Sequence, residues 1–491
     1  RLWEDYRHFM NSKNTLTTAP IFSTIWRLSL PNMLAMAAGA LVTIAETSYI
    51  GRLGTFPLAG IALVFPMVML QQMISAGSMG GGISSAISRA IGAGDDDKAN
   101  QLVMHAFAIS LGLGILYSLL FLVWGREIFA LIGGYGVALD EAMAYSNIAF
   151  SGAITIWLTN AFASAIRGSG NMKTPSTVLM LVAVAQVVLG GALGLGLGPF
   201  PQFGMAGVAA GQVIAYSFSA IYLGQYLRTS GSRVTLNFSL QFIPSYFKDI
   251  LRVGAIASIS SVQTVLTILI LTKIVAGFGP GALAGYGIGT RLEFLLIPIT
   301  FAIGVACVPM VGMAIGGGLV KRAKQVAWTG AALSAGIVGV IGLFAAVLPD
   351  HWASLFTDNA EVIGITHLYL MWVAPVYGFF ALGLCLYFAS QGAGKLLGPV
   401  LAGTLRLVMV AGGGFYMLQA GTSPSSLFAL IACAMAAYGI VTAAYWGFTL
   451  TDGALRMLAL MSAERSPAFP NVPTLKELGV ANGVVDTWYG V

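Results

Sequence analysis

The chain has 491 residues, of which 57% are hydrophobic and only 9% are Asp, Glu, Lys or Arg. A typical soluble domain carries roughly 25% charged residues, so this chain has too few charges to cover a water-facing surface. The composition therefore excludes a soluble globular protein. The 62 glycines follow no three-residue period, which excludes collagen. The net charge of +6 would suit a nucleic-acid binder, but the basic residues gather at the ends of apolar segments.

These apolar segments are bounded by charged residues, glycine or proline. A membrane-spanning helix needs about 20 apolar residues, and each segment is long enough. In chain order the predicted spans are 24–50, 56–80, 102–125, 142–166, 175–198, 205–227, 250–277, 281–312, 325–348, 364–389, 397–419 and 425–450. We therefore predict twelve transmembrane helices.

The Lys and Arg residues predict the orientation, because cytoplasmic loops of membrane proteins are enriched in them. With the N-terminus inside, two of the 24 basic residues, Arg52 and Arg126, fall in outer loops and three fall within spans, which leaves 19 inside. We therefore expect a multi-pass protein of the cell inner (plasma) membrane with both termini in the cytoplasm. The basic surplus is a topology signal, so we expect no nucleic-acid partner.

The two halves of the chain repeat one another at an offset of 224 residues. The matched positions are Ile91-Gly92-x-Gly94 with Ile315-Gly316-x-Gly318, Gly168-x-Gly170 with Gly392-x-Gly394, and Pro175 with Pro399. Each half carries six spans, an even number, so both halves keep the same orientation. The repeat therefore predicts an axis along the membrane normal with a substrate path between the halves.

The predicted fold is an all-α integral membrane protein with twelve transmembrane helices in two six-helix lobes related by a pseudo-two-fold along the membrane normal. The expected parts are a cytoplasmic leader (1–23), an N-lobe (24–227), a cytoplasmic linker (228–248), a C-lobe (249–452) and a tail (453–491). Residues 1–9 precede Met10 and are expected to lie upstream of the true start.

This architecture is typical of a secondary transporter. The nearest approach to an ATP-binding loop, Gly392-Ala393-Gly394-Lys395, lacks the earlier glycine and the following Ser or Thr of a P-loop. No nucleophile elbow, zinc-protease motif or intramembrane histidine cluster is present. We therefore expect a protein that is not an enzyme and has no metal site or cofactor.

Several motifs in order along residues 24–450 resemble the multidrug and toxic compound extrusion (MATE) family. They are Ser29-Leu30-Pro31 at the start of the first span, Glu46 to Gly54 at its end, Gly92-Ala93-Gly94-Asp95, Arg167-Gly168-x-Gly170 with Pro175, and Arg291-x-Glu293. The resemblance implies cation-coupled export of organic compounds. In several bacterial and archaeal members of the family, an acidic residue of span 1 works with polar residues of spans 4 and 5. The resemblance implies the same arrangement here.

Carried over residue by residue, the resemblance makes Glu46, Asn160 and Gln186 the candidate ion-coupling residues. Glu46 lies where the family usually has Asp, fifteen residues after the kink proline Pro31. In span 5 the family has a second acid where this chain has Gly190, so a two-carboxylate site is reduced to one carboxylate.

Each candidate also has a structural interpretation. Glu46 lies about 9 Å from Arg52 along the helix, at 1.5 Å per residue, and could pair with it instead of binding an ion. Asn160 and Gln186 could hydrogen-bond Glu46 or pack between helices; Asn147 matches the depth of Glu46 better than Asn160 does. Removal from water would favour the protonated form of Glu46, which could then load outside and release inside.

The C-lobe offers a candidate second site at Glu293 and Arg291. Residues two apart do not share a helix face, so each needs its own partner. Glu293 could be a second coupling acid or half of a structural ion pair, whereas the deeper Arg406 has no partner that the sequence identifies. Met and aromatic side chains suit a deformable drug pocket, and their alternative role is to face lipid or fill contacts between helices. The candidates are Met67, Met69, Gln72 and Met73 in span 2 and Tyr369, Trp372 and Tyr377 in span 10.

The tail has a different composition. Through Pro470-x-Val472-Pro473 and Trp488-Tyr489-Gly490 it resembles the C-terminal part of solute receptors of tripartite tricarboxylate transporters. Such a fragment is too short to form a receptor core, and the predicted topology leaves it in the cytoplasm. We expect it to have no ligand function.

The predicted function is a secondary active antiporter for multidrug (xenobiotic) efflux. It exports organic, often cationic, compounds in exchange for protons or sodium ions. The alternative is a lipid-linked precursor flippase of the same superfamily, which should line its cavity with several basic residues. Apart from Arg27 and Arg252, which lie at span ends and count with the cytoplasmic residues, only Lys273, Arg291 and Arg406 lie within the spans. This scarcity favours the exporter. The expected partners are small organic substrates and the lipid bilayer, with the protein as a monomer.

Overall fold

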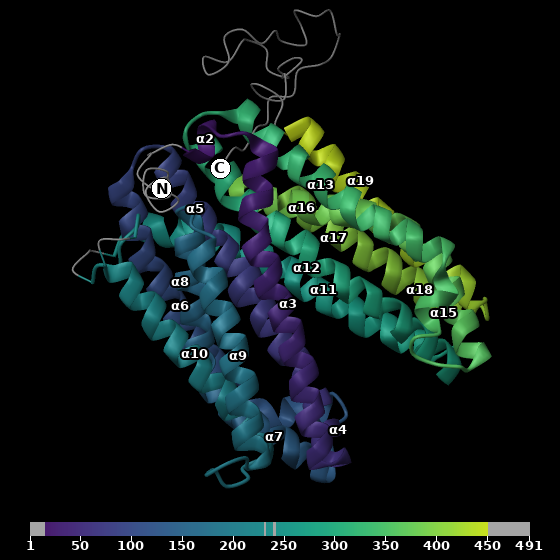
Figure 1. Ribbon diagram of the computed structural model, residues 1–491. Helices are drawn as coiled ribbons and strands as arrows, with labels where there is room; N and C mark the ends of the chain where they lie inside the picture. Colours follow the sequence, from purple (N-terminus) through teal and green to yellow (C-terminus); the bar gives the residue numbers. More distant parts are fainter. Residues whose placement is uncertain (1–14, 230–231, 239–241, 450–491) are drawn as a thin grey trace, which may run out of the picture. The chain divides into compact units, whose positions relative to one another are not determined.

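The computed structural model describes residues 15–229, 232–238 and 242–449, and every element in these ranges is helical (Figure 1). The predicted tail 453–491 and residues 1–14 of the predicted leader lie outside them. The described residues up to Thr442 form one compact unit. The helix packing described for the two lobes lies within this unit.

The first lobe contains six spans. Its elements are α3 (Ile21–Leu53), α4 (Thr55–Gln72) continuing through the π-helix η1 (Met73–Met79) into α5 (Gly80–Gly92), α6 (Asp96–Leu131), the pair α7 (Gly136–Ser151) and α8 (Ala153–Gly168), α9 (Lys173–Leu195) and α10 (Gly204–Arg228). A short helix, α2 (Thr15–Thr18), precedes them. Helix α3 packs against α9, α9 against α10, α4 against α7, and α6 against α8.

The second lobe follows the same plan. Its elements are α11 (Pro244–Ala276), α12 (Pro280–Gly316), α13 (Val320–Val347), the short α14 (Pro349–Ala353), α15 (Ala360–Val373) with η2 (Ala374–Val376) and α16 (Tyr377–Ala393), α17 (Leu397–Val408) with η3 (Met409–Gly413) and α18 (Gly414–Gln419), and α19 (Pro424–Thr449). Helix α11 begins at Pro244, within the predicted linker 228–248.

The predicted number of spans is confirmed in the described residues. Eleven helices are long and apolar enough to cross a membrane, and the pair α7 and α8, bent by 46°, supplies the twelfth. The bend lies at Gly152, where a Cβ atom would meet Val213 of α10 at 2.4 Å. The sequence prediction of one continuous span over 142–166 missed this break.

The internal repeat appears as repeated contacts. In the first lobe a Cβ atom on Gly168 would lie 2.9 Å from the Ser84 carbonyl oxygen. In the second lobe a Cβ atom on Gly392 would lie 2.5 Å from the Val308 carbonyl oxygen. Both positions of the second contact are offset by 224 from those of the first. The shared glycines therefore mark helix pairs that approach too closely for a side chain.

Two glycines of the repeat also hold the lobes together. A Cβ atom on Gly92 of α5 would lie 2.2 Å from the Met313 carbonyl oxygen, and one on Gly316 of α12 would lie 2.0 Å from the Arg89 carbonyl oxygen. The offset of 224 maps each contact onto the other, as a two-fold axis between lobes requires. We call these two contacts, Gly92 with Met313 and Gly316 with Arg89, the glycine seam.

Polar contacts between the lobes accompany the seam. Lys98 of α6 forms an ion pair of 2.9 Å with Asp249 of α11. The Ser85 hydroxyl donates to the Gln391 carbonyl oxygen, and the hydroxyls of Ser78 and Ser261 lie 2.8 Å apart. In Figure 1 the ends of α5 and α16 lie together, on the side of the bundle where α3 begins. In the predicted orientation this side faces the cytoplasm.

Candidate functional site

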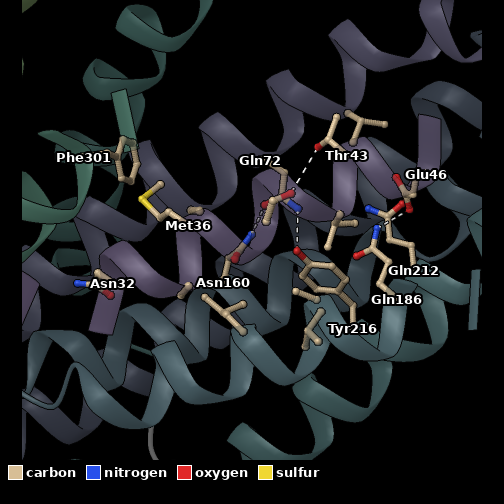
Figure 2. Close-up of a pocket in the computed structure, with 18 of the residues that line it drawn as sticks. Asn32, Met36, Thr43, Glu46, Gln72, Asn160, Gln186, Gln212, Tyr216 and Phe301 are labelled. Carbon is tan, nitrogen blue, oxygen red and sulfur yellow. Dashed lines mark hydrogen bonds between the residues drawn. The ribbon is translucent and has the colours of Figure 1, made fainter. Parts of the chain in front are cut away.

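A cavity of about 380 Å³ lies against the first lobe (Figure 2). Its wall consists mainly of residues from α3, α4, α8, α9 and α10, and a short apolar stretch of α12 around Phe301 adds the second lobe. Figure 2 shows Asn32 and Glu46 of α3 at opposite ends of the cavity, with Asn160 between them. Helix α3 continues through Pro31, the predicted kink position.

Glu46 and Gln186 meet in the cavity wall. The Gln186 amide on α9 donates a hydrogen bond of 2.7 Å to a carboxylate oxygen of Glu46. Gln186 is buried, and both residues line the cavity. The predicted alternative partner Arg52 is exposed, and no ion pair joins it to Glu46 in the described part of the chain. The structure thus brings together two of the three predicted coupling residues.

Asn160 belongs to a different polar group, so of its predicted alternatives the structure shows polar contacts between helices and no bond to Glu46. Its amide donates to the Ser75 hydroxyl of η1 at 2.8 Å and to the Gln72 amide oxygen at 3.2 Å. Gln72 in turn donates to the Tyr216 hydroxyl of α10 at 3.1 Å. Helix α8 carries Asn160 toward the seam, past the level of Glu46. Asn147, the better match in depth, is exposed and does not line the cavity.

A second group near Glu46 was missed by the sequence analysis. Gln212 of α10 lies beside Glu46 and Gln186 in Figure 2, and its amide oxygen accepts a bond of 3.2 Å from the Tyr145 hydroxyl. Gln212 and Tyr216 are four residues apart and so share one face of α10. The signal that could have found them is a pair of polar residues at helical spacing inside an apolar span.

Gly190 stands where the family has its second acid, and it packs against α10. A Cβ atom on Gly211 of α10 would lie 2.3 Å from the Gly190 amide nitrogen, whereas a Cβ atom on Gly190 would meet the Val208 carbonyl oxygen at an ordinary 3.4 Å. Gly190 does not line the cavity. Among the described residues that line it, Glu46 is therefore the one carboxylate.

Glu293 and Arg291 lie in the second lobe, away from the cavity. Glu293 accepts hydrogen bonds from the Tyr369 hydroxyl and, at 3.3 Å, from the Tyr377 hydroxyl. The guanidinium of Arg291 lies 5.0 Å from the centre of the Phe356 ring. As their spacing predicted, the two charges have separate partners. Arg406, whose partner the sequence did not identify, lies 4.9 Å from the centre of the Phe380 ring.

Most of the Met and aromatic candidates lie outside the cavity, in agreement with their alternative role in lipid-facing or helix-packing positions. Of the seven candidates only Gln72 lines the cavity. Tyr369 and Tyr377 hold Glu293 instead, and Trp372 is exposed and donates to the Ser425 hydroxyl at 2.9 Å. The apolar wall comes from Met36, Phe65 and Phe301, among other residues. Helix rotation, which composition does not specify, decides which of several apolar residues in a span reaches the cavity.

Known proteins share this sequence pattern and fold. The family model MatE matches residues 31–191 and 257–412, once in each half. A curated "FAD transporter" of Shewanella oneidensis is 25% identical over 383 residues, which cover 78% of this chain and 84% of that protein. The "Multidrug export protein MepA" of Staphylococcus aureus MSSA476 is 25% identical over 442 residues, covering 86% and 94%.

A solved MOP superfamily transporter from Pyrococcus furiosus has the same fold, with a TM-score of 0.83, 23% identity, and coverage of 90% of this chain and 98% of that chain. The family match spans more than half of the sequence and falls in both lobes. The chain therefore belongs to the MATE family of membrane transporters.

Proposed function

We propose that the protein is a secondary active antiporter that exports organic compounds across the plasma membrane in exchange for protons or sodium ions. The observation that carries the proposal is the carboxylate of Glu46, which lines a cavity of about 380 Å³ and accepts a hydrogen bond from Gln186. The names of two relatives, a FAD transporter and a multidrug export protein, agree with an organic substrate.

The seam supports an alternating-access cycle. With both termini in the cytoplasm, the glycine seam closes the cytoplasmic side, so this state would exchange ions and substrate with the outside. Coupling requires that the ion and the substrate compete for one site or favour opposite-facing states. A proton or sodium ion at Glu46 can do either, because it changes the charge of the cavity wall and the bond from Gln186.

The flippase alternative requires a cavity rich in basic residues. Among the described residues that line the cavity, Arg167 is the one basic side chain. The predicted preference for an exporter over a flippase therefore agrees with the composition of the cavity.

Purified protein in proteoliposomes should move a fluorescent organic substrate when a gradient is imposed. A pH gradient and a sodium gradient are imposed separately, and we expect one of them to drive transport. No accumulation is expected when both gradients are collapsed. Exchange of one monovalent cation for one proton is electrically neutral, so about 1.4 kcal/mol per pH unit permits roughly tenfold accumulation. Accumulation that persists without any ion gradient would contradict the antiport proposal.

Single cysteines should report the orientation. After the three native cysteines, of which Cys433 is exposed, are replaced, a cysteine in the loop 228–243 should resist an impermeant thiol reagent added to intact cells. A cysteine at Asp358, in the loop between α14 and α15, should react. The opposite pattern would invert the topology and place the glycine seam on the outer side.

A further inference from the structure

Arg167 is a partly buried charge that the coupling scheme does not use. It lies in the last turn of α8 and lines the cavity. Its Nε atom is buried without a hydrogen-bond partner, and with the described residues its guanidinium makes no ion pair. Removing a guanidinium from water without a partner is costly, so an arginine in this position is suited to a ligand that supplies the missing acceptor.

The charges of the cavity are placed at different depths. Among the described residues that line it, Glu46 and Arg167 are the charged ones. Helix α8 carries Arg167 about two turns, roughly 10 Å, beyond Asn160 toward the seam. Glu46 lies at the opposite end of the cavity from Asn32 (Figure 2). The cavity therefore has a carboxyl group that can take up a coupling ion at one end and a fixed positive charge toward the other.

The second lobe shows that the fold does not need this charge. The repeat offset of 224 places Gln391 at the position of Arg167, each followed by the Gly-x-Gly motif. Gln391 is buried and donates to the Gly77 carbonyl oxygen at 3.2 Å and to the Tyr387 hydroxyl at 3.0 Å. Both side chains line a second, much smaller cavity beside the seam. A neutral amide thus fills the equivalent place in one lobe, whereas the lobe with the large cavity carries an unpaired cation.

We propose that Arg167 binds an anionic group, a carboxylate or a phosphate, carried by the substrate, so that the cavity accepts zwitterionic or anionic organic compounds. The planar guanidinium matches the two oxygens of either group. The proposal rests on the proposed function in taking the cavity as the substrate site.

The test compares two dyes that differ in one charge. Rhodamine B carries a free carboxylate, and its ethyl ester is a cation without one. Binding is measured by fluorescence anisotropy with the full-length protein in phosphatidylcholine nanodiscs, with no ion gradient. We expect the wild type to bind the acid, and Arg167→Gln, which installs the residue of the second lobe, to weaken acid binding at least tenfold while leaving ester binding unchanged or tighter. Arg167→Lys should lie between them.

The matched control is Arg228→Gln, which changes an exposed arginine in the last turn of α10 and should alter neither dye. No binding of the acid by the wild type, equal affinity for the two dyes, or parallel losses of both in Arg167→Gln would overturn the proposal. Excess inorganic phosphate should compete with the acid in the wild type, because it offers the same oxygens to the guanidinium. Loss of the preference for the acid in phosphatidylglycerol nanodiscs would overturn substrate recognition, because Arg167 would then hold a lipid headgroup. If antiport fails in proteoliposomes while the Arg167-dependent preference persists, the proposed function is wrong but this site stands.

Discussion

Replacing Glu46 with Gln should abolish gradient-driven export while leaving substrate affinity within about twofold. The substitution keeps the size of the side chain and a hydrogen-bond acceptor for the Gln186 amide, but it removes the group that can take up a proton or a sodium ion. Because Glu46 is the one carboxylate among the described cavity residues, no neighbour in the wall can replace it. Export is measured in proteoliposomes with an imposed gradient, and affinity is measured without one.

Glu46→Asp, which restores the usual residue of the family, should retain activity. Glu127→Gln is the matched control, because Glu127 lies in the same lobe on α6 and is exposed. Export by Glu46→Gln at the parental rate would move the coupling elsewhere. Glu293, held by Tyr369 and Tyr377 in the second lobe, is then the next residue to replace.

The charge of the substrate decides how much energy one coupling ion supplies. If Arg167 takes a zwitterionic substrate, exchange for one proton carries a net positive charge inward. The membrane potential then adds about 2.3 kcal/mol per 100 mV to the pH gradient. A cationic substrate exchanged one for one gains nothing from the potential. The sensitivity of export to an imposed potential therefore links the two proposed roles, Glu46 for coupling and Arg167 for substrate charge.

The twelve spans and the two-fold repeat could be predicted from the sequence because both depend on patterns longer than a helix turn. An apolar run of 20 residues is unambiguous in a chain with few charges, and the offset of 224 held across separate motifs. The breaks inside spans were missed since they depend on a neighbour. The bend at Gly152 lies where a Cβ atom would clash with Val213 of α10, and nothing local distinguishes that glycine from the others.

The site was harder to predict because it depends on how each helix is rotated. The family resemblance brought Glu46 and Gln186 to notice, and the structure joins them. Asn160, the third candidate, bonds Ser75 and Gln72 instead. Arg167 was counted as a charge at a cytoplasmic loop and as part of the Arg167-Gly168-x-Gly170 motif, with no place in the site. Its position in the cavity wall depends on how α8 packs against the neighbouring helices, which the sequence alone does not show.

Adding a methyl group in the glycine seam should prevent the lobes from closing. Gly316→Ala would place a Cβ atom 2.0 Å from the Arg89 carbonyl oxygen, and Gly92→Ala would place one 2.2 Å from the Met313 carbonyl oxygen. Both acceptors are backbone atoms of helices, so neither can turn aside as a flexible side chain would. The lobes must separate by about an ångström or more, and we expect each variant to lose export at least tenfold while it still inserts and binds substrate.

The separation of the lobes can be measured as the distance between spin labels at Asp97 and Lys321. Both residues are exposed, lie near the starts of α6 and α13, and are related by the offset of 224. Gly316→Ala and Gly92→Ala should lengthen this distance and shift its distribution toward a single open state. Gly112→Ala and Gly336→Ala are matched controls on α6 and α13, because a Cβ atom there meets nothing within 4 Å. In a helix interior the change from Gly to Ala is favourable by about 1 kcal/mol, so the controls should keep parental export and distance. Seam variants that match these controls would mean that the lobes do not need this contact to close.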